Sequence, residues 1–148
     1  FHRKDKVALS QLIHNCARLS FVLGAISLFV FVFFGESLLG LFGREFESGY
    51  KCLIILLVGH VINTASGPVG LLLTLTGSQG YAAKVMLGCA LFNVALNYIL
   101  ILEYGITGAA LATTVTTVLW NLFMYFRVKS SLGLDPSILG RTVTREEG

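Results

Sequence analysis

Charged residues are scarce in this sequence. Only 13% of its 148 residues are Asp, Glu, Lys or Arg, whereas 55% are hydrophobic and the mean hydropathy is +0.78. A soluble domain carries about 25% charged residues, so this composition argues against an ordinary water-soluble protein. We therefore expect an all-α, polytopic transmembrane helix bundle in contact with the lipid bilayer.

The residue patterns of enzyme active sites are also missing. The sequence has no nucleophile elbow, no pair of carboxylates in an apolar span, no glycine-rich phosphate loop and no metal-ligand spacing. Its basic residues flank apolar runs and do not alternate with aromatics as in a nucleic-acid groove. Three cysteines lie far apart and are interpreted as small buried hydrophobes: Cys16, Cys52 and Cys89. We predict no enzyme, no cofactor, no metal and no nucleic-acid partner.

Long apolar runs are present, and they approach the length of about 17–25 residues that a bilayer requires. They predict four transmembrane helices, over residues 19–42, 52–76, 84–102 and 105–127. Residues 130–148 are predicted to form a short cytoplasmic tail.

The segment before the first span, residues 1–18, has apolar residues at helical spacing. They are Leu9, Leu12, Ile13 and Cys16, followed by Leu19. This pattern predicts an amphipathic helix that lies in the membrane surface or leads into the first span. The alternative is the loop end of a preceding span.

The distribution of Lys and Arg predicts the orientation of the spans. Alternating spans place nine of these residues on one side of the membrane and only Arg44 and Lys51 on the other. Because cytoplasmic loops carry the excess of basic residues, both ends are expected in the cytoplasm.

The second span contains a helix breaker. Pro68 has no N–H to donate, and its ring would clash with the carbonyl of Thr64 in a continuous helix. We therefore predict a bend at Gly67, Pro68 and Gly70, with the freed Thr64 carbonyl facing protein or a water-filled cavity.

Polar side chains recur at helical spacing in two of the spans. His60, Asn63, Thr64 and Gly67 share one face of the second span, and Asn93 and Asn97 share one face of the third. The amides, together with Asn121, either join helices by hydrogen bonds or face a solute. His60 is the one ionisable residue deep in a span, and it is either functional or a neutral, capped histidine.

The fourth span has small residues on one side and bulky ones on the other. The small stripe consists of Gly105, Gly108, Ala109, Ala112 and Thr116. Such stripes let two membrane helices approach closely, so this one predicts packing and not chemistry.

Two stretches resemble the C-terminal part of polysaccharide flippases. These flippases belong to the multidrug/oligosaccharidyl-lipid/polysaccharide exporter superfamily. The stretches are GHVINTASGPVGLLLTLTGSQGYAAKV and LFNVALNYILILEYGITGAALATTVTTVLWNLFMYFRVKSSLG. The matching positions include the TG turn at Thr76 and Gly77, the amides Asn93 and Asn97, and the turn beginning at Tyr104.

The resemblance implies a transporter of two helix bundles that face one central cavity. This chain would supply the last four spans of the second bundle, with the remaining transmembrane helices of the full-length chain as its partners. The chain begins at Phe1 and not at Met, which also indicates a piece of a longer protein. Basic cavity residues for lipid-linked phosphates are expected in such flippases, and none lies deep in a span here.

Our first hypothesis is a flippase of the bacterial inner membrane that exports a lipid-linked oligosaccharide by alternating access. Its cavity-side residues would be His60, Asn63, Asn93 and Asn97. The alternatives are a drug/cation antiporter of the same superfamily, a small four-helix membrane scaffold subunit, and a membrane-embedded glycosyltransferase or polymerase.

Overall fold

The computed structural model describes residues 3–43, 46, 49–132 and 137; for residues 3–10 and 132 it describes the backbone alone. Regular structure in these residues is entirely helical, so the predicted all-α class is confirmed. The helices are α1 (Arg3–Gly40), α3 (Tyr50–Ala65), α4 (Val69–Leu75), α5 (Gln79–Tyr104) and α6 (Ile106–Leu132). Most of the predicted tail, residues 133–136 and 138–148, lies outside the described residues.

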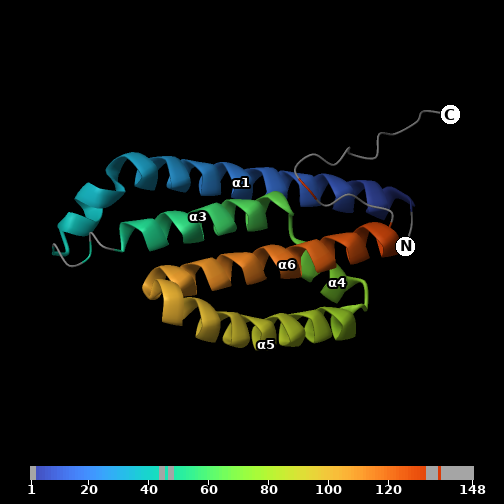
Figure 1. Ribbon diagram of the computed structural model, residues 1–148. Coiled ribbons are helices and arrows are strands. Elements are labelled where there is room, and N and C mark those ends of the chain that lie inside the picture. The colour runs from blue at the N-terminus through green and yellow to red at the C-terminus, as the bar shows by residue number, and fades with distance from the viewer. Residues whose placement is uncertain (1–2, 44–45, 47–48, 133–136, 138–148) are drawn as a thin grey trace.

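The four long helices lie side by side in the order α1, α3, α6, α5 (Figure 1). The inner helix α3 packs against both α1 and α6, and α5 packs against α6. The short helix α4 lies against α5 and α6 near the end of the layer where α1 begins. α3 and α6 are therefore the inner helices of the layer, and α4 covers part of one face of α6.

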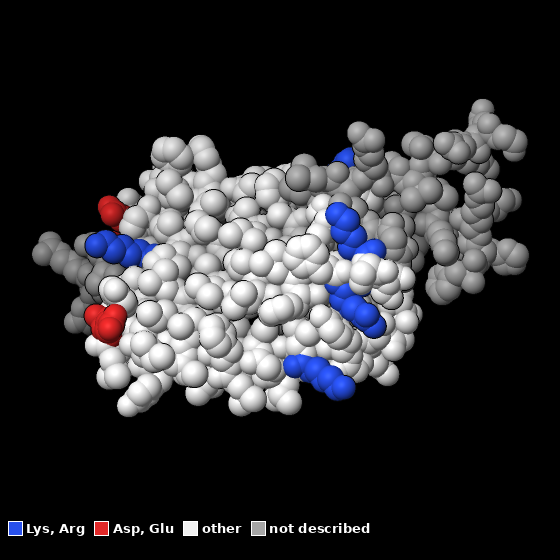
Figure 2. All heavy atoms as spheres, turned by 45° about the vertical axis from the view of Figure 1, so that its right-hand side comes forward, with Lys and Arg blue, Asp and Glu red and all other residues white. Residues whose placement is uncertain are grey.

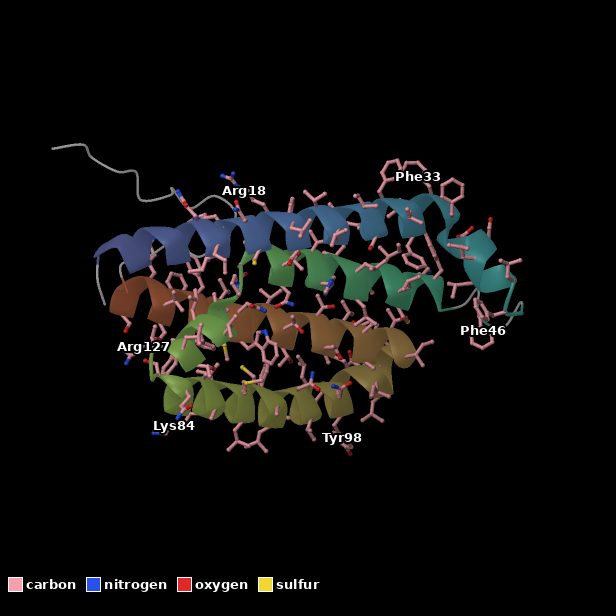
Figure 3. The ribbon with its side chains drawn as sticks, turned by 180° about the vertical axis from the view of Figure 1, so that it is seen from behind. Arg18, Phe33, Phe46, Lys84, Tyr98 and Arg127 are labelled. Atoms are coloured by element: carbon pink, nitrogen blue, oxygen red, sulfur yellow. The ribbon has the colours of Figure 1, made fainter. Side chains whose placement is uncertain are left out.

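The helices have the length and composition of membrane spans. Within the described residues, Gln11–Gly40, Gln79–Tyr104 and Ile106–Ser131 qualify singly, and the bent pair α3–α4 qualifies together. Large apolar side chains cover the outer helices: Phe33 on α1 and Tyr98 on α5 point away from the layer (Figure 3). Such a surface suits hydrocarbon and not water.

Helix α1 includes the N-terminal segment, which was predicted either to lie in the membrane surface or to lead into the first span. It is continuous from Arg3 to Gly40, so a separate amphipathic helix is not confirmed, and the N-terminal segment leads directly into the first span. The reason is local, because neither glycine nor proline occurs before Gly24. Of the predicted apolar face, Ile13 is buried, whereas Leu12, Cys16 and Leu19 are exposed.

Basic residues near the ends of the spans lie inside helices. Lys84 is in the second turn of α5, and Arg127 and Lys129 are in the last turns of α6. A charge ends the part of a helix that suits hydrocarbon, but the backbone continues its hydrogen bonds in the headgroup region.

Small residues allow close contact between the inner helices. A Cβ at Gly59 of α3 would lie 2.9 Å from Cγ2 of Thr114 on α6. The Thr114 hydroxyl donates a hydrogen bond of 3.0 Å to the Ile55 carbonyl across the same contact. Close approach and hydroxyl bonds replace the hydrophobic driving force that is absent in lipid.

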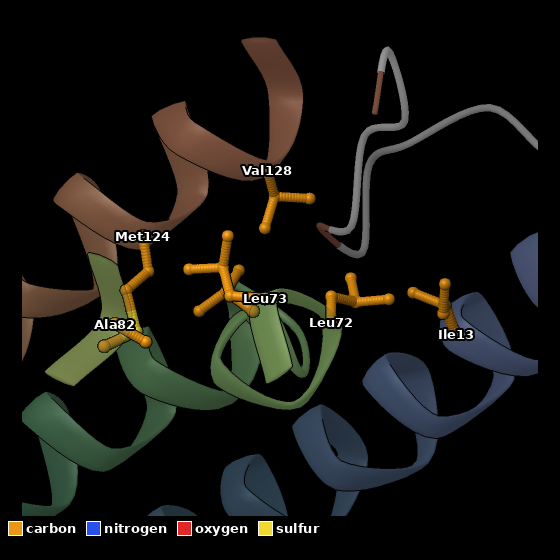
Figure 4. Packing of buried hydrophobic residues seen from close by; sticks show 7 residues of the cluster. Ile13, Leu72, Leu73, Ala82, Met124 and Val128 are labelled. Carbon is orange, nitrogen blue, oxygen red and sulfur yellow. The ribbon is translucent and has the colours of Figure 1, made fainter. Parts of the chain in front are cut away.

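The core of the described chain surrounds α4 (Figure 4). Leu72 and Leu73 are 1% and 0% exposed. They belong to a cluster that joins α1, α5 and α6 through Ile13, Ala82, Met124 and Val128. This cluster fixes the short helix to its neighbours.

The link from α4 to α5 is a Schellman turn. The Gly77 N–H donates to the Thr74 carbonyl at 3.3 Å, and the Ser78 N–H donates to the Leu73 carbonyl at 2.8 Å. This motif requires a left-handed residue, and Gly77 adopts a φ of 76°.

Candidate functional site

The second span is broken at residues 66–68. The axes of α3 and α4 differ by 41°, and Gly67 and Pro68 lie in the break. Gly67 has a φ of 77°, which residues with a Cβ rarely adopt. Gly70 lies within the first turn of α4, where an added Cβ would meet Sδ of Met124 at 3.8 Å.

The Thr64 carbonyl, which the sequence analysis expected to be freed, has a partner. The Gly67 N–H donates to it at 3.2 Å, in place of the N–H that Pro68 lacks. The break is therefore closed locally by the turn itself, and the carbonyl does not need a cavity to satisfy it.

Three hollows open along one face of α6, and the largest of them reaches the break. A hollow of about 320 Å³ is bordered by residues of the break, by α1 and by Asn63, Trp120 and Asn121. A second, of about 240 Å³, lies between α3 and α6, and a third, of about 190 Å³, lies between α5 and α6. Trp120 lines all three, so this side chain is at the centre of the candidate site.

Asn63 connects α3 with α6. The Nδ2 group of Asn121 donates to Oδ1 of Asn63 at 2.7 Å and to the Thr117 carbonyl at 2.7 Å. Asn121 is only 3% exposed, so this amide pair is a buried link between the helices. Asn63 also lines two of the hollows. It therefore both joins two helices by a hydrogen bond and faces open space, so the two interpretations of this amide do not exclude each other.

The other amide pair lies between α5 and α6. Nδ2 of Asn93 donates to the Thr116 hydroxyl at 3.1 Å, and Nδ2 of Asn97 donates to Oδ1 of Asn93 at 2.9 Å. Asn93 lines the hollow of about 190 Å³ beside Trp120, whereas Asn97 lines none of the three hollows.

His60 is exposed on the face of α3 that carries Asn63. It lines the hollow of about 240 Å³ together with Thr113, Thr117 and Trp120. Its Cδ2 atom would lie 3.9 Å from a Cβ at Gly24, so the ring extends beside α1. The structure thus brings His60 and Asn63 to one site, with Asn93 at its edge.

The two faces of α6 differ in polarity. Thr113, Thr117 and Trp120 repeat at intervals of four and three residues and therefore share one face. The opposite face carries Val115 and Leu122, which are 42% and 45% exposed. The polar face suits protein or water, and the apolar face suits lipid.

Sequence reasoning missed Trp120, Thr113 and Thr117 as site residues. Their helical spacing could have identified them, because it places all three on one face of the fourth span, separate from the small stripe and from the bulky side. Among the residues the structure describes, no three His, Cys, Asp or Glu side chains are grouped to hold a metal ion.

Two curated proteins are similar to this chain. The probable low-salt glycan biosynthesis flippase Agl15 of Haloferax volcanii is 30% identical over 115 residues, which are 77% of this chain and 24% of that protein. The capsular polysaccharide biosynthesis protein CapF of Staphylococcus aureus is 26% identical over 127 residues, which are 85% of this chain and 32% of that protein. The chain is related to polysaccharide flippases.

These two relatives, one of them named as a flippase, confirm the resemblance drawn from the sequence. The chain spans only about a quarter to a third of their lengths. No model of a known protein family and no solved structure matches it.

In this chain, the described charges lie toward the ends of the layer. Arg18, Lys84 and Arg127 lie toward the end where α1 begins, whereas Phe46 lies at the opposite end (Figure 3). Lys and Arg gather at the first end, and the visible Asp and Glu lie at the other, next to a basic side chain (Figure 2). The three hollows between these ends have no Asp, Glu, Lys or Arg in their linings.

Proposed function

We propose that this chain is part of a membrane flippase that exports a lipid-linked oligosaccharide for the synthesis of cell-surface polysaccharide. The observation that carries this proposal is the similarity to a protein named as a glycan biosynthesis flippase. The apolar helices and the polar, uncharged hollows on one face of the layer support it. Transport by alternating access needs no covalent chemistry, so no catalytic residue is assigned.

The polar face would form part of the wall of the transport cavity. His60, Asn63 and Asn93 would contribute side chains to this wall, and Asn97 would hold Asn93 in position through its hydrogen bond. Helices elsewhere in the full-length protein would form the rest of the cavity. They would also have to supply basic groups for the phosphates of the lipid carrier, since these hollows contain none.

The distribution of basic residues supports an orientation of the chain in the membrane. Of its 11 Lys and Arg residues, nine fall on the side expected to be cytoplasmic. The basic side chains at one end of the layer are in keeping with this orientation (Figure 2). The proposed location is the inner (plasma) membrane, with both ends of the chain in the cytoplasm.

Export by the full-length protein tests this proposal directly. Cells that lack the protein should accumulate lipid-linked oligosaccharide in the inner leaflet and lose surface polysaccharide, and the wild-type gene should restore both. If polysaccharide export is unchanged but uptake of a drug or cation depends on the gene, the antiporter alternative replaces the flippase proposal.

The bend at Pro68 should matter for transport more than for the amount of protein. Alanine at this position restores an N–H that can donate to the Thr64 carbonyl, which favours a straight span by up to about 3 kcal/mol. In the same cells, Pro68→Ala should slow export about tenfold, which corresponds to about 1.4 kcal/mol of this energy. Protein level should change little.

Ser66→Ala is the matched control for Pro68→Ala. It alters the same break but removes only the hydroxyl bond of 3.1 Å from Ser66 to the Ile62 carbonyl. Export by this variant should stay near the wild-type rate. Equal losses of export and of protein level in Pro68→Ala would show that the bend serves folding alone.

A further inference from the structure

We propose that Trp120 and the polar groups around it bind a neutral sugar ring of the transported glycan, and not its phosphate. This inference rests on the proposed function and specifies which part of the substrate this chain recognises. It follows from the shape of the site, its unpaired hydrogen-bonding groups and its lack of charge.

Trp120 provides the flat surface that such a site needs. Its half-buried indole lines three adjoining hollows, the largest of about 320 Å³. Ligand pockets commonly measure about 300–1,000 Å³ and combine aromatic walls with a few placed polar groups. One face of a pyranose ring presents C–H groups, which pack against the electron-rich face of an indole.

Hydrogen-bonding groups with free capacity surround the indole. Asn63 uses its carbonyl oxygen for Asn121, and its NH₂ group makes no hydrogen bond within the described residues. The Thr117 hydroxyl and the His60 ring also lack partners in that part of the chain. These groups include donors and acceptors, which is the set that sugar hydroxyls require.

The lack of charge decides between the two polar parts of a lipid-linked glycan. A phosphate or pyrophosphate is bound through Arg or Lys, or through the N-terminus of a helix. The linings of the three hollows contain no Arg and no Lys, and α6 presents its middle turns there. The first turn of α4 borders the largest hollow, but this helix has only 7 residues and so contributes few aligned peptide dipoles. An uncharged ligand with many hydroxyls therefore fits best.

A separate groove on this chain is apolar and suits hydrocarbon better than sugar. It measures about 390 Å³ between α5 and α6 and is lined by Val85, Gly88, Cys89, Phe92, Leu119 and Phe123. This lining has no amide, hydroxyl or imidazole side chain, whereas the Trp120 site has all three. The contrast supports sugar, and not hydrocarbon, as the occupant of the polar hollows.

Binding to two lipids tests the inference. The full-length protein in nanodiscs is titrated with the host's lipid-linked oligosaccharide and with the same polyprenyl pyrophosphate without sugars. Trp120→Ala should weaken binding of the glycan lipid about tenfold and leave binding of the sugar-free lipid unchanged. Trp120→Phe, which retains an aromatic face, should lose less.

Thr117→Val keeps the inference testable if Trp120→Ala does not fold. It preserves side-chain shape, removes one hydroxyl and should weaken binding of the glycan lipid about fivefold. Leu122→Ala, on the opposite face of α6, is the control and should bind both lipids as the wild type does.

The outcomes separate this inference from the proposed function. If the wild type binds the glycan lipid and the Trp120 and Thr117 variants bind it equally well, sugar recognition here is wrong and the flippase proposal stands. Equal weakening for both lipids would also overturn the inference, because the effect would not depend on sugar. If the wild type binds neither lipid, the proposed function fails as well.

Discussion

Gly108→Ala is expected to prevent α5 and α6 from packing as they do in this structure. A Cβ at residue 108 would overlap the backbone carbonyl of Leu100, and the backbone on both sides belongs to a helix. A backbone atom cannot rotate away as a side chain can, so the helices must separate. We expect the free energy of unfolding to fall by about 3 kcal/mol, at the upper end of overpacking effects.

Gly88→Ala is the matched control for this prediction. Gly88 also lies within α5, but a Cβ at that position would meet nothing within 4 Å. The free energy of unfolding of the full-length protein, measured by SDS denaturation in mixed micelles, should be unchanged or slightly raised, because alanine favours helix. Equal stability of the two variants would contradict the close packing of α5 on α6.

Leu73→Ala is expected to release α4 from the core. Leu73 is 0% exposed, and it joins α5 and α6 through contacts in the cluster around Met124 and Ala82 (Figure 4). Removing a buried leucine side chain leaves a cavity and costs about 2–5 kcal/mol. The loss is expected to be large because a helix of 7 residues cannot hold itself together without its packing.

Leu71→Ala provides the control on the same helix. Leu71 is 59% exposed, so its truncation removes contacts with the surroundings and creates no cavity. The same denaturation experiment should show a change of less than about 1 kcal/mol. A comparable loss in both variants would mean that α4 is not anchored by the side of the helix that carries Leu73.

The spans and their helical class were predictable because hydrophobicity and charge act locally. A run without charge must be helical in lipid, whatever its neighbours are. The sequence left the continuity of α1 open, because the charges before Leu19 also fit a separate helix in the membrane surface. Charge limits the apolar length of a helix but does not by itself end the helix.

The composition of the candidate site was less predictable. Asn63 and His60 stood out because polar residues are rare in a span, but nothing local to Asn63 shows that Asn121 is its partner. Trp120 did not stand out, because a tryptophan among apolar residues is usual in a membrane helix. Its importance comes from its position between three hollows, which depends on the packing of α3, α5 and α6.

The central claim is that one face of this layer borders a water-filled cavity and the other borders lipid. Reaction of single cysteines with a water-soluble maleimide tests it most directly, in a full-length protein without its native cysteines. Thr113 and Val115 are both exposed and lie on opposite faces of α6. Thr113→Cys should react and Val115→Cys should not, whereas no reaction at Thr113→Cys, or faster reaction at Val115→Cys, would contradict the claim.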